Sequence, residues 1–501
     1  MPMVIKLNWT IMLLLVGIAG GCARSDALRS TDDSATKPAE EAKLEDGQAE
    51  NRGVTTASIL PPKKQGKKTL STLLAEMLVN NPDIAIAGAR EKEQWFGVKL
   101  AEAAKNPNFD VSASAGPQHI FIPSSGGDAI RRDMTVSMRQ TLYDFGVISN
   151  DIKRAERSYA SATKARIAKA ESVAQDVMDA FLDVKKFDEL IAVTQKSIAA
   201  HQKILDLVSI TAENGSGTMA DVKRITAKLE NAKSDLIDLT TRRGDAADVF
   251  KNLTDTEFGQ IDDRAYSKLF GKVTELDAAA IEVNPDVQSI NEEIESLKYQ
   301  LASVKAGKMP VIALQGSVKA ARNVNSAASS DEQFSTYAIA TLRVPLYDGG
   351  VNDSQLGQIE SRLEAAKLRL EKQKRDLLQQ TENVKRLSQS GGDKAGSIEV
   401  RVNAAKKVAD LYFEQFKTGG RTLFELLDAQ SESYKSQSDL IQQAYERKTS
   451  ILQALRIKGN LVRSILETSP PDIHIELDET ASVSEPPPAD FGLPGVRVQK
   501  P

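Results

Sequence analysis

The sequence predicts a mainly α protein with membrane β-strands: long, coiled-coil-like α-helical hairpins and four β-strands per protomer, arranged as an internal two-fold repeat. Three observations predict this class. Short motifs recur at a constant offset, apolar residues follow helical spacing over very long segments, and two pairs of shorter segments alternate apolar with polar residues. Aromatic residues make up only 5% of the 501 residues, which disfavours large compact cores.

The repeat is visible in three pairs of matching motifs. Asn-Pro-Asp occurs at 81–83 and 284–286, and Leu-Tyr-Asp-x-Gly occurs at 142–146 and 346–350. The third pair is Gly215 and Gly419, and the offset stays at 203 to 204 residues throughout. Because each unit is far longer than a solenoid repeat, we interpret the chain as a duplicated domain.

The N-terminus has the order of a secretory signal: Lys6, an apolar stretch at 11–18, and small residues before Cys22. The apolar stretch is too short to cross a bilayer. Cys22 is the only cysteine, so no disulfide forms within the chain. The run at 19–22 resembles a bacterial lipobox, and we expect lipidation of Cys22 in the outer membrane. The alternative is an ordinary signal that is cut near Cys22.

Composition divides the chain into five segments. A signal peptide at 1–21 precedes a polar tether at 22–68, which cannot bury enough apolar surface to fold alone. The two repeats occupy 69–272 and 273–467. A proline-rich tail at 468–501 is expected to lack structure, like the tether.

The first hairpin is predicted from its uninterrupted helical pattern. Residues 147–214 contain neither Gly nor Pro up to the tip, and their apolar positions recur at steps of four and three. Such a helix is about 100 Å long at about 1.5 Å per residue. A Gly-rich tip follows, and the helical pattern resumes at 221–253.

The second hairpin repeats this order. Helical segments at 351–390 and 421–456 flank a tip at 418–420. The second unit differs at 391–396, where three glycines replace the unbroken helix of the first unit. We expect the helix to break or kink there.

Two segments with a period of two residues precede each hairpin. Over about nine to eleven residues, apolar and polar side chains alternate, which is typical of membrane β-strands. The predicted outward positions are Phe109, Val111, Ala113 and Ala115; Met134, Val136 and Met138; Ile312, Leu314, Gly316 and Val318; and Phe334, Thr336, Ala338, Ala340, Leu342 and Val344. Four strands are too few to close a membrane barrel, so the chain is expected to oligomerise.

Composition and motifs argue against nucleic-acid binding and catalysis. The net charge is only −4, with 65 basic and 69 acidic residues, so there is no basic footprint for nucleic acid. His119, His201 and His474 are isolated, and no nucleophile or phosphate-binding motif is present. We expect no enzyme activity, no cofactor and no metal. Asp144 and Asp348, at strand-helix junctions, are predicted to be helix caps.

The two Asn-Pro-Asp starts, the two Leu-Tyr-Asp-x-Gly junctions and the run at 416–429 resemble the TolC family of outer-membrane efflux and secretion channels, over about 70–467. The resemblance implies a homotrimer with a 12-stranded barrel and a periplasmic helical tunnel. It also implies that a periplasmic adaptor and an inner-membrane ABC or proton-driven transporter complete a tripartite efflux or type I secretion system. The cargo, small molecule or protein, stays open.

The resemblance further implies a gate at the tunnel entrance. The family often has two aspartates one helical turn apart, and Glu425 and Asp428 fill these positions, with Glu in place of the first Asp. Positions i and i+3 share a helix face, so three copies bring six carboxylates to one constriction that favours cations. The alternative is an ordinary solvated acidic face.

A latch is implied by the same resemblance. Arg421 matches an arginine that helps to hold the entrance closed, and Asp221 matches its acidic partner. Phe416 stands where relatives can carry a tyrosine, so a hydroxyl hydrogen bond is impossible and the latch is weaker or built differently. The alternative for Arg421 is an ordinary charge near a helix start.

The hairpin tips are expected to dock the adaptor. The residues concerned are Gly215, Gly217, Gly419 and Gly420, which allow sharp turns and present backbone to a partner. Simple turn chemistry explains the same glycines. A rival reading of the whole chain, a lipid-anchored periplasmic helical scaffold or adaptor, explains the helices but not the four strand-like segments.

Overall fold

The computed structural model describes residues 68–120, 127–262, 266–271, 279–325, 330–467, 475–477 and 496–498. All of them belong to one compact unit, Lys64–Pro501. The signal segment, Cys22 and all of the predicted tether except its last residue lie outside the described residues. In the tail expected to lack structure, β7 (Ile475–Leu477) and β8 (Val496–Val498) pair as antiparallel strands.

The described elements follow the duplicated order. The first repeat contains β1 (Lys68–Thr69), α2 (Leu70–Asn80), α3 (Pro82–Ala103), β2 (Asn108–Ile120), β3 (Gly127–Tyr143), α4 (Val147–Glu213), α5 (Met219–Thr254), η1 (Phe258–Gln260), β4 (Ile261–Asp262) and η2 (Tyr266–Gly271). The second contains α6 (Ala279–Glu282), α7 (Pro285–Ala306), β5 (Val311–Asn325), β6 (Ser330–Arg343), α8 (Val351–Lys417), α9 (Leu423–Ile457) and α10 (Leu461–Leu466). The short strands β1 and β4 pair in parallel.

The repeated motifs start helices in the same way in both repeats. The side chains of Asn81 and Asn284 cap α3 and α7, and the following Pro occupies the first helical turn, where no backbone N–H is needed. Asp144 accepts hydrogen bonds from the backbone N–H groups of Gly146 and Ile148, and Asp348 accepts the equivalent pair ahead of α8. The predicted capping role of both aspartates is confirmed.

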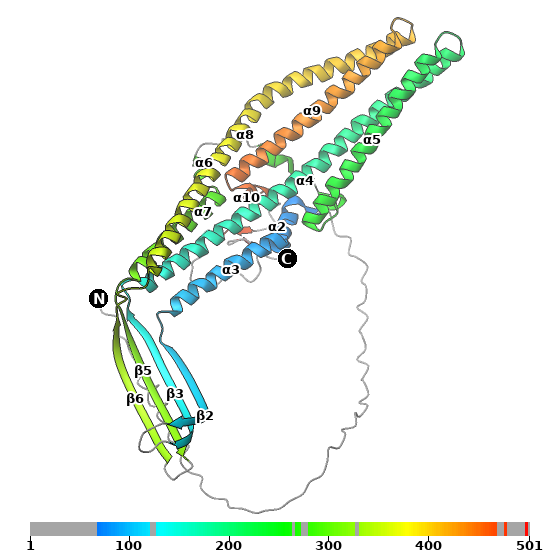
Figure 1. Cartoon of the computed structure of the whole chain (residues 1–501). Helices are drawn as coiled ribbons and strands as arrows, with labels where there is room; N and C mark the ends of the chain where they lie inside the picture. The colour runs from blue at the N-terminus through cyan, green and yellow to red at the C-terminus, as the bar shows by residue number, and fades with distance from the viewer. Residues whose placement is uncertain are drawn as a thin grey trace, which may run out of the picture. The chain divides into compact units, whose positions relative to one another are not determined.

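The two hairpins are built from helices of nearly matching length. α4 and α8 each span 67 residues, and α5 and α9 return from their tips (Figure 1). The break predicted at 391–396 is wrong, because α8 is continuous through the three glycines. Gly391 is buried in the helix, and α8 contacts α9, so tertiary contact along the helix outweighs the low helix propensity of glycine. The ribbon of α8 bends in this region without interruption (Figure 1).

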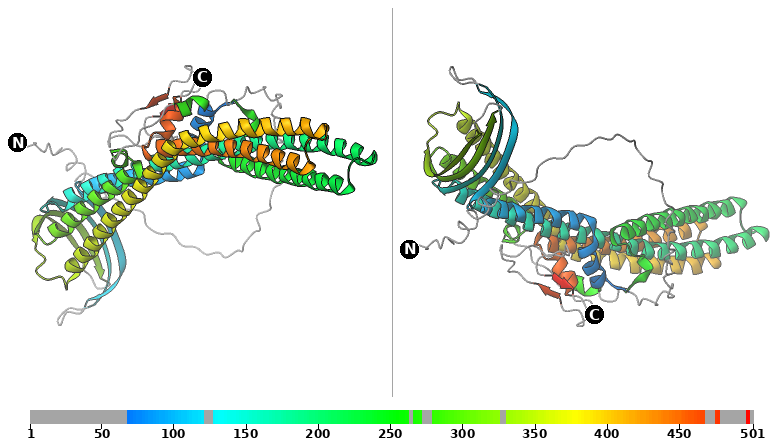
Figure 2. Two further views of the ribbon diagram at one scale, coloured as in Figure 1. Left: turned by 90° about the horizontal axis from the view of Figure 1, so that it is seen from above. Right: turned by 90° about the horizontal axis from the view of Figure 1, so that it is seen from below.

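Four antiparallel strands form one sheet in the order β2-β3-β5-β6. The strands are 13, 17, 15 and 14 residues long, more than predicted, and they curve together (Figure 2). Val111, Val136, Val318 and Thr336 lie opposite one another across all four strands, so the predicted apolar positions share one face. Within the sheet, the two repeats meet at the β3–β5 pair. One edge of β2 and one edge of β6 therefore remain unpaired within the sheet.

The main apolar core lies where the two repeats meet between sheet and tips. It joins α2, the middle of α4, the end of α9 and α10, with Phe181 and Phe250 fully buried in it. Asn284 donates from Nδ2 to the carbonyl oxygen of Ile457 at 2.9 Å and ties the start of α7 to the end of α9. Among the described residues, no helix combines the length and the apolar character that a bilayer crossing requires.

Burial differs sharply between the two longest helices. α4 has 20 buried residues and α8 has nine, although the two have equal length. The reason is that α4 contacts α7 and α9 of the other repeat in addition to α3 and α5, whereas α8 contacts only its own repeat extensively. One side of α8 is therefore uncovered in a single chain.

A buried ion pair distinguishes the first repeat. Arg166 on α4 donates to Glu91 on α3, both side chains are at most 2% exposed, and the Thr163 hydroxyl donates to the second carboxylate oxygen at 2.7 Å. In the second repeat the equivalent positions are apolar: Ile294 is buried, and Leu370 is partly buried against an apolar cluster. The same helix contact is thus solved once with charges and once without them.

The difference between the two repeats predicts the effect of replacing the charged pair of the first repeat with the apolar residues of the second. Arg166→Leu or Glu91→Ile alone leaves one buried charge without its partner, and we expect a loss of about 3–5 kcal/mol. The double variant copies the second repeat and is expected to lie within about 1 kcal/mol of wild type or above it. Denaturant unfolding of the purified protein, followed by helical circular dichroism, measures all three. Additive losses in the double variant would contradict the prediction.

A second buried carboxylate ties α4 to α10. Glu171 is 4% exposed and accepts hydrogen bonds from the backbone N–H groups of Leu461 at 2.9 Å and Val462 at 3.3 Å. Burial raises the pKa of Glu171 to about 7, against the lowering effect of these two hydrogen bonds.

Stability is expected to depend on pH through Glu171. Its pKa is higher in the folded state, so the unfolded chain loses this proton first, and stability falls as pH rises from about 4.5 to about 7. The loss is up to about 3 kcal/mol. Glu171→Gln should remove this slope, and Glu213→Gln, at an exposed position of the same helix, should keep it. Melting temperatures measured between pH 4.5 and 8 test both; equal slopes in the two variants would refute the assignment.

Candidate functional site: the hairpin tips

The two tips turn by the same backbone geometry. Gly215 and Gly419 have φ of +74° and +75°, a region that favours glycine. The N–H of Gly217 donates to Thr211 O at 3.0 Å, and the N–H of Gly420 donates to Gln415 O at 2.8 Å, closing the ends of α4 and α8. The predicted turn role of these glycines is thus visible, whereas adaptor docking stays a prediction.

A shared apolar cluster packs the two hairpins together just behind the tips. Its buried members come from α4, α5 and α9: Ile204, Val208, Ile225, Leu423, Leu426 and Leu427. Phe416, at the end of α8, is half-buried and packs against this cluster. Phe416 therefore contributes apolar contact where a tyrosine would contribute a hydroxyl.

Glu425 is the third residue of a capping box at the start of α9. Its carboxylate accepts from the Thr422 backbone N–H at 3.0 Å and from the Thr422 hydroxyl at 2.9 Å, while the N–H of Glu425 donates to the Thr422 hydroxyl at 3.3 Å. The hydrogen bond from the Thr422 backbone is the largest of the effects that lower the pKa of Glu425. Glu425 is thus anionic at neutral pH and holds the tip as well as facing solvent.

Arg421 is engaged within its own hairpin. It donates to Glu425 at 2.8 Å and to Gln415 Oε1 at 3.1 Å, and its guanidinium lies 4.4 Å from the centre of the Tyr412 ring. Asp221 instead accepts from the Thr218 hydroxyl at 2.7 Å and lies 4.0 Å from Arg224. The expected Arg421–Asp221 contact is therefore not formed within one chain, because each residue already pairs with neighbours close in sequence.

The duplication relates the two acidic tip residues to each other. Asp221 and Glu425 lie 204 residues apart, and each is the third residue after a capping threonine, Thr218 or Thr422. The Thr-x-x-Asp and Thr-x-x-Glu patterns were readable in the sequence, but their equivalence was missed, and Asp221 was interpreted only as the partner of Arg421. In both tips the backbone N–H of the acidic residue donates to the capping threonine hydroxyl, but only the Glu425 carboxylate also accepts from the threonine backbone N–H.

Asp428 is the acidic tip residue that keeps its full exposure. It lies one turn after Glu425 on α9 and makes no ion pair within the part of the chain that the structure describes. Its equivalent in the first repeat is Arg224, so only the second tip presents two carboxylates on neighbouring turns. No cluster of His, Cys, Asp and Glu suited to a metal ion occurs among the described residues.

Comparison with known proteins identifies the family. The sequence profile of the outer membrane efflux protein family matches residues 73–253 and 278–459. The nodulation protein T of Rhizobium leguminosarum bv. trifolii is 20% identical over 75% of this chain and 82% of its own length. The outer membrane protein TolC of Vibrio cholerae is 21% identical over 79% of this chain and 91% of its own length.

Solved structures share the fold. VceC of Vibrio cholerae superposes with a TM-score of 0.69 at 15% identity, covering 77% of this chain and 95% of VceC. The MtrE channel of Neisseria gonorrhoeae gives a TM-score of 0.68 at 16% identity, over 78% and 89% of the two chains. With both repeats matched and the TolC-like fold present, the chain belongs to the outer membrane efflux protein family and is an outer-membrane efflux channel.

Proposed function

We propose that three copies of this chain form the outer-membrane exit of a tripartite efflux or type I secretion system, which receives cargo from a periplasmic adaptor and an inner-membrane ABC or proton-driven transporter. One observation carries the assembly. The main contacts between the two repeats inside the chain, β3–β5, α4–α7 and α4–α9, have equivalent surfaces that are largely exposed in the single chain. Applying the 203- to 204-residue offset to the internal contacts therefore predicts the contacts between copies.

The sheet supports this rule. Shifting the β3–β5 pair by the repeat offset gives a β6–β2 pair between neighbouring copies, which joins the two unpaired edges. Val136 lies opposite Val318 in the chain, and the equivalent residues, Ala340 and Ala115, both lie on the apolar face. The pairing satisfies edge backbone groups that an open sheet leaves unpaired in lipid.

The helices support the same rule through their exposure. Leu423 is 5% exposed because α9 packs on α4, whereas its equivalent on α5, Met219, is 66% exposed. Ile204 is fully buried on α4, whereas its equivalent on α8, Val408, is 40% exposed. Packing α5 of one copy on α8 of the next buries both exposed residues in the way that the chain already buries their equivalents.

A disulfide between copies tests the predicted contact. Ser158 and Ser296 join α4 to α7 by a hydroxyl hydrogen bond of 2.8 Å, and their equivalents are Arg362 and Glu93, both exposed and oppositely charged. In a Cys22→Ser background, Glu93→Cys with Arg362→Cys should give an oxidised species of three linked chains on non-reducing gels, because hydrogen-bonded serines lie within disulfide reach.

The matched control places the second cysteine on a different face of α8. Glu93→Cys with Glu364→Cys should remain a single chain after oxidation, since Glu364 is two residues from the contact position and faces elsewhere on the helix. A wild-type mobility for the Glu93 and Arg362 pair, or equal linking in both pairs, would sink the proposed arrangement.

The second tip is proposed to form the gate, with Arg421 reaching Asp221 of a neighbouring copy in the closed state and Glu425 and Asp428 lining the constriction. Asp428 is exposed without an ion pair among the described residues, whereas Glu425 is shared with the capping box. Most of the ion selectivity is therefore assigned to Asp428.

Single-channel recording in a planar bilayer tests both conduction and the gate. Arg421→Ser should raise the conductance, because the latch is lost. Asp428→Asn should lower cation selectivity more than Glu425→Gln, which keeps the capping geometry. Glu432→Gln, one turn further along α9, is the control and should leave selectivity unchanged. Wild-type behaviour of the Arg421 and Asp428 variants would place the gate elsewhere, and absence of conduction by the wild-type protein would favour the scaffold alternative.

A further inference from the structure

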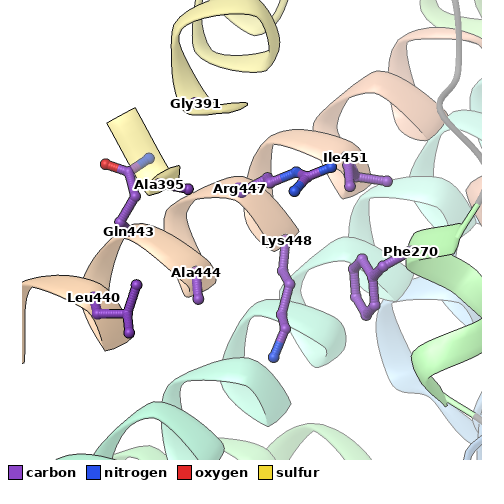
Figure 3. A pocket seen from close by; sticks show the side chains of 9 residues that line it. All are labelled: Phe270, Gly391, Ala395, Leu440, Gln443, Ala444, Arg447, Lys448 and Ile451. Carbon is purple, nitrogen blue, oxygen red and sulfur yellow. The ribbon is translucent and has the colours of Figure 1, made fainter. Parts of the chain in front are cut away.

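A cavity of about 270 Å³ lies between α8, α9 and η2, and none of its lining residues belongs to the hairpin tips or the four-stranded sheet. Figure 3 shows these lining side chains. The walls of the cavity are mostly apolar, and two cationic side chains and one amide also line it. The lining residues are Phe270, Gly391, Ala395, Leu440, Gln443, Ala444, Arg447, Lys448 and Ile451.

The duplication explains why space is left here. Gly391 and Ala395 stand where the first repeat has Phe187 and Ile191, so α8 lacks two large apolar side chains that α4 carries. A Cβ at Gly391 would meet only Gln443 Nε2, at 3.9 Å. The glycine is therefore not required by a close backbone approach, and its effect is to open the cavity.

Gln443 brings an unsatisfied polar group into this cavity. The residue is 6% exposed, and its Oε1 is buried without a hydrogen-bond partner among the described residues. The first repeat has Leu239 at the equivalent position. A buried acceptor without a donor is costly, so Gln443 Oε1 needs a donor from outside the chain, which a water molecule or a ligand in the cavity can supply.

Two cationic side chains, Arg447 and Lys448, line the same cavity and extend in different directions (Figure 3). Arg447 makes no ion pair within the described part of the chain, and Lys448 Nζ lies 4.0 Å from the centre of the Tyr445 ring. Lys448 replaces Gly244 of the first repeat, whereas Arg447 has an arginine equivalent, Arg243, which is paired with Asp188 at 3.0 Å. Compared with the first repeat, the second therefore has one additional cation, Lys448, and one arginine, Arg447, that lacks the carboxylate partner of its equivalent.

We propose that this cavity is a binding site for a small amphiphilic anion. The ligand class has an aromatic or short alkyl body in the space left by Gly391 and Ala395, an N–H or O–H donor to Gln443 Oε1, and an acidic group near Arg447 and Lys448. The site is separate from the gate and does not depend on which cargo the channel carries.

Fluorine NMR of 5-fluoroindole-3-acetate tests the site, because this probe combines an aromatic ring, an N–H donor and a carboxylate. Adding full-length assembled protein in detergent should broaden the fluorine line in a saturable way, beyond detergent alone. Gly391→Phe, which restores the residue of the first repeat, should weaken binding about tenfold or more. Gln443→Leu should weaken it about fivefold, the value of one ordinary hydrogen bond.

The control is Gly392→Phe, which adds the same ring at the neighbouring exposed position, where a Cβ meets no atom within 4 Å. This variant should bind like wild type. The proposal is wrong if wild type does not broaden the line, as expected if a neighbouring copy fills the cavity, or if Gly391→Phe binds the probe as tightly as wild type does. Equal weakening by Gly391→Phe and Gly392→Phe would also overturn it.

Discussion

The need of edge strands for backbone partners governs this molecule. Four strands present two unpaired edges, and the hydrocarbon of a membrane offers no water to satisfy them. In the proposed trimer, joining those edges across copies sets the order of the other elements. The strands lead directly into α4 and α8 through Asp-capped glycine turns, so the position of each strand fixes the start of one long helix. The hairpins consequently meet in the order that the strands dictate.

Features written in local sequence were predictable. Asn81, Asn284, Asp144 and Asp348 act through hydrogen bonds to backbone groups two to four residues away, and such caps need no knowledge of the fold. The strand faces followed from the same kind of local rule, the period of two. Because the repeat offset is constant, each local prediction made for the first repeat also applied to the equivalent residues of the second.

Features decided by distant contacts were not predictable. Gly391 was interpreted as a helix breaker because its propensity was visible and its packing against α9 was not. The pairing of Arg421 with Asp221 within one chain failed for a different reason: it rested on the resemblance, whereas the contacts that Arg421 makes in the chain, with Glu425 and Tyr412, are local. The Glu91–Arg166 pair also went unnoticed, since nothing in the spacing of two charges 75 residues apart indicates that they meet in a core.

The small number of buried residues in α8 affects the stability of that helix in a single chain. An isolated helix gains little stability from propensity alone, and long helices in proteins depend on packing of an apolar face. In the single chain α8 has that packing on one side only, whereas α4 is packed against both repeats. In a single chain the uncovered side of α8 therefore leaves that helix less well protected against local unfolding and proteolysis than α4.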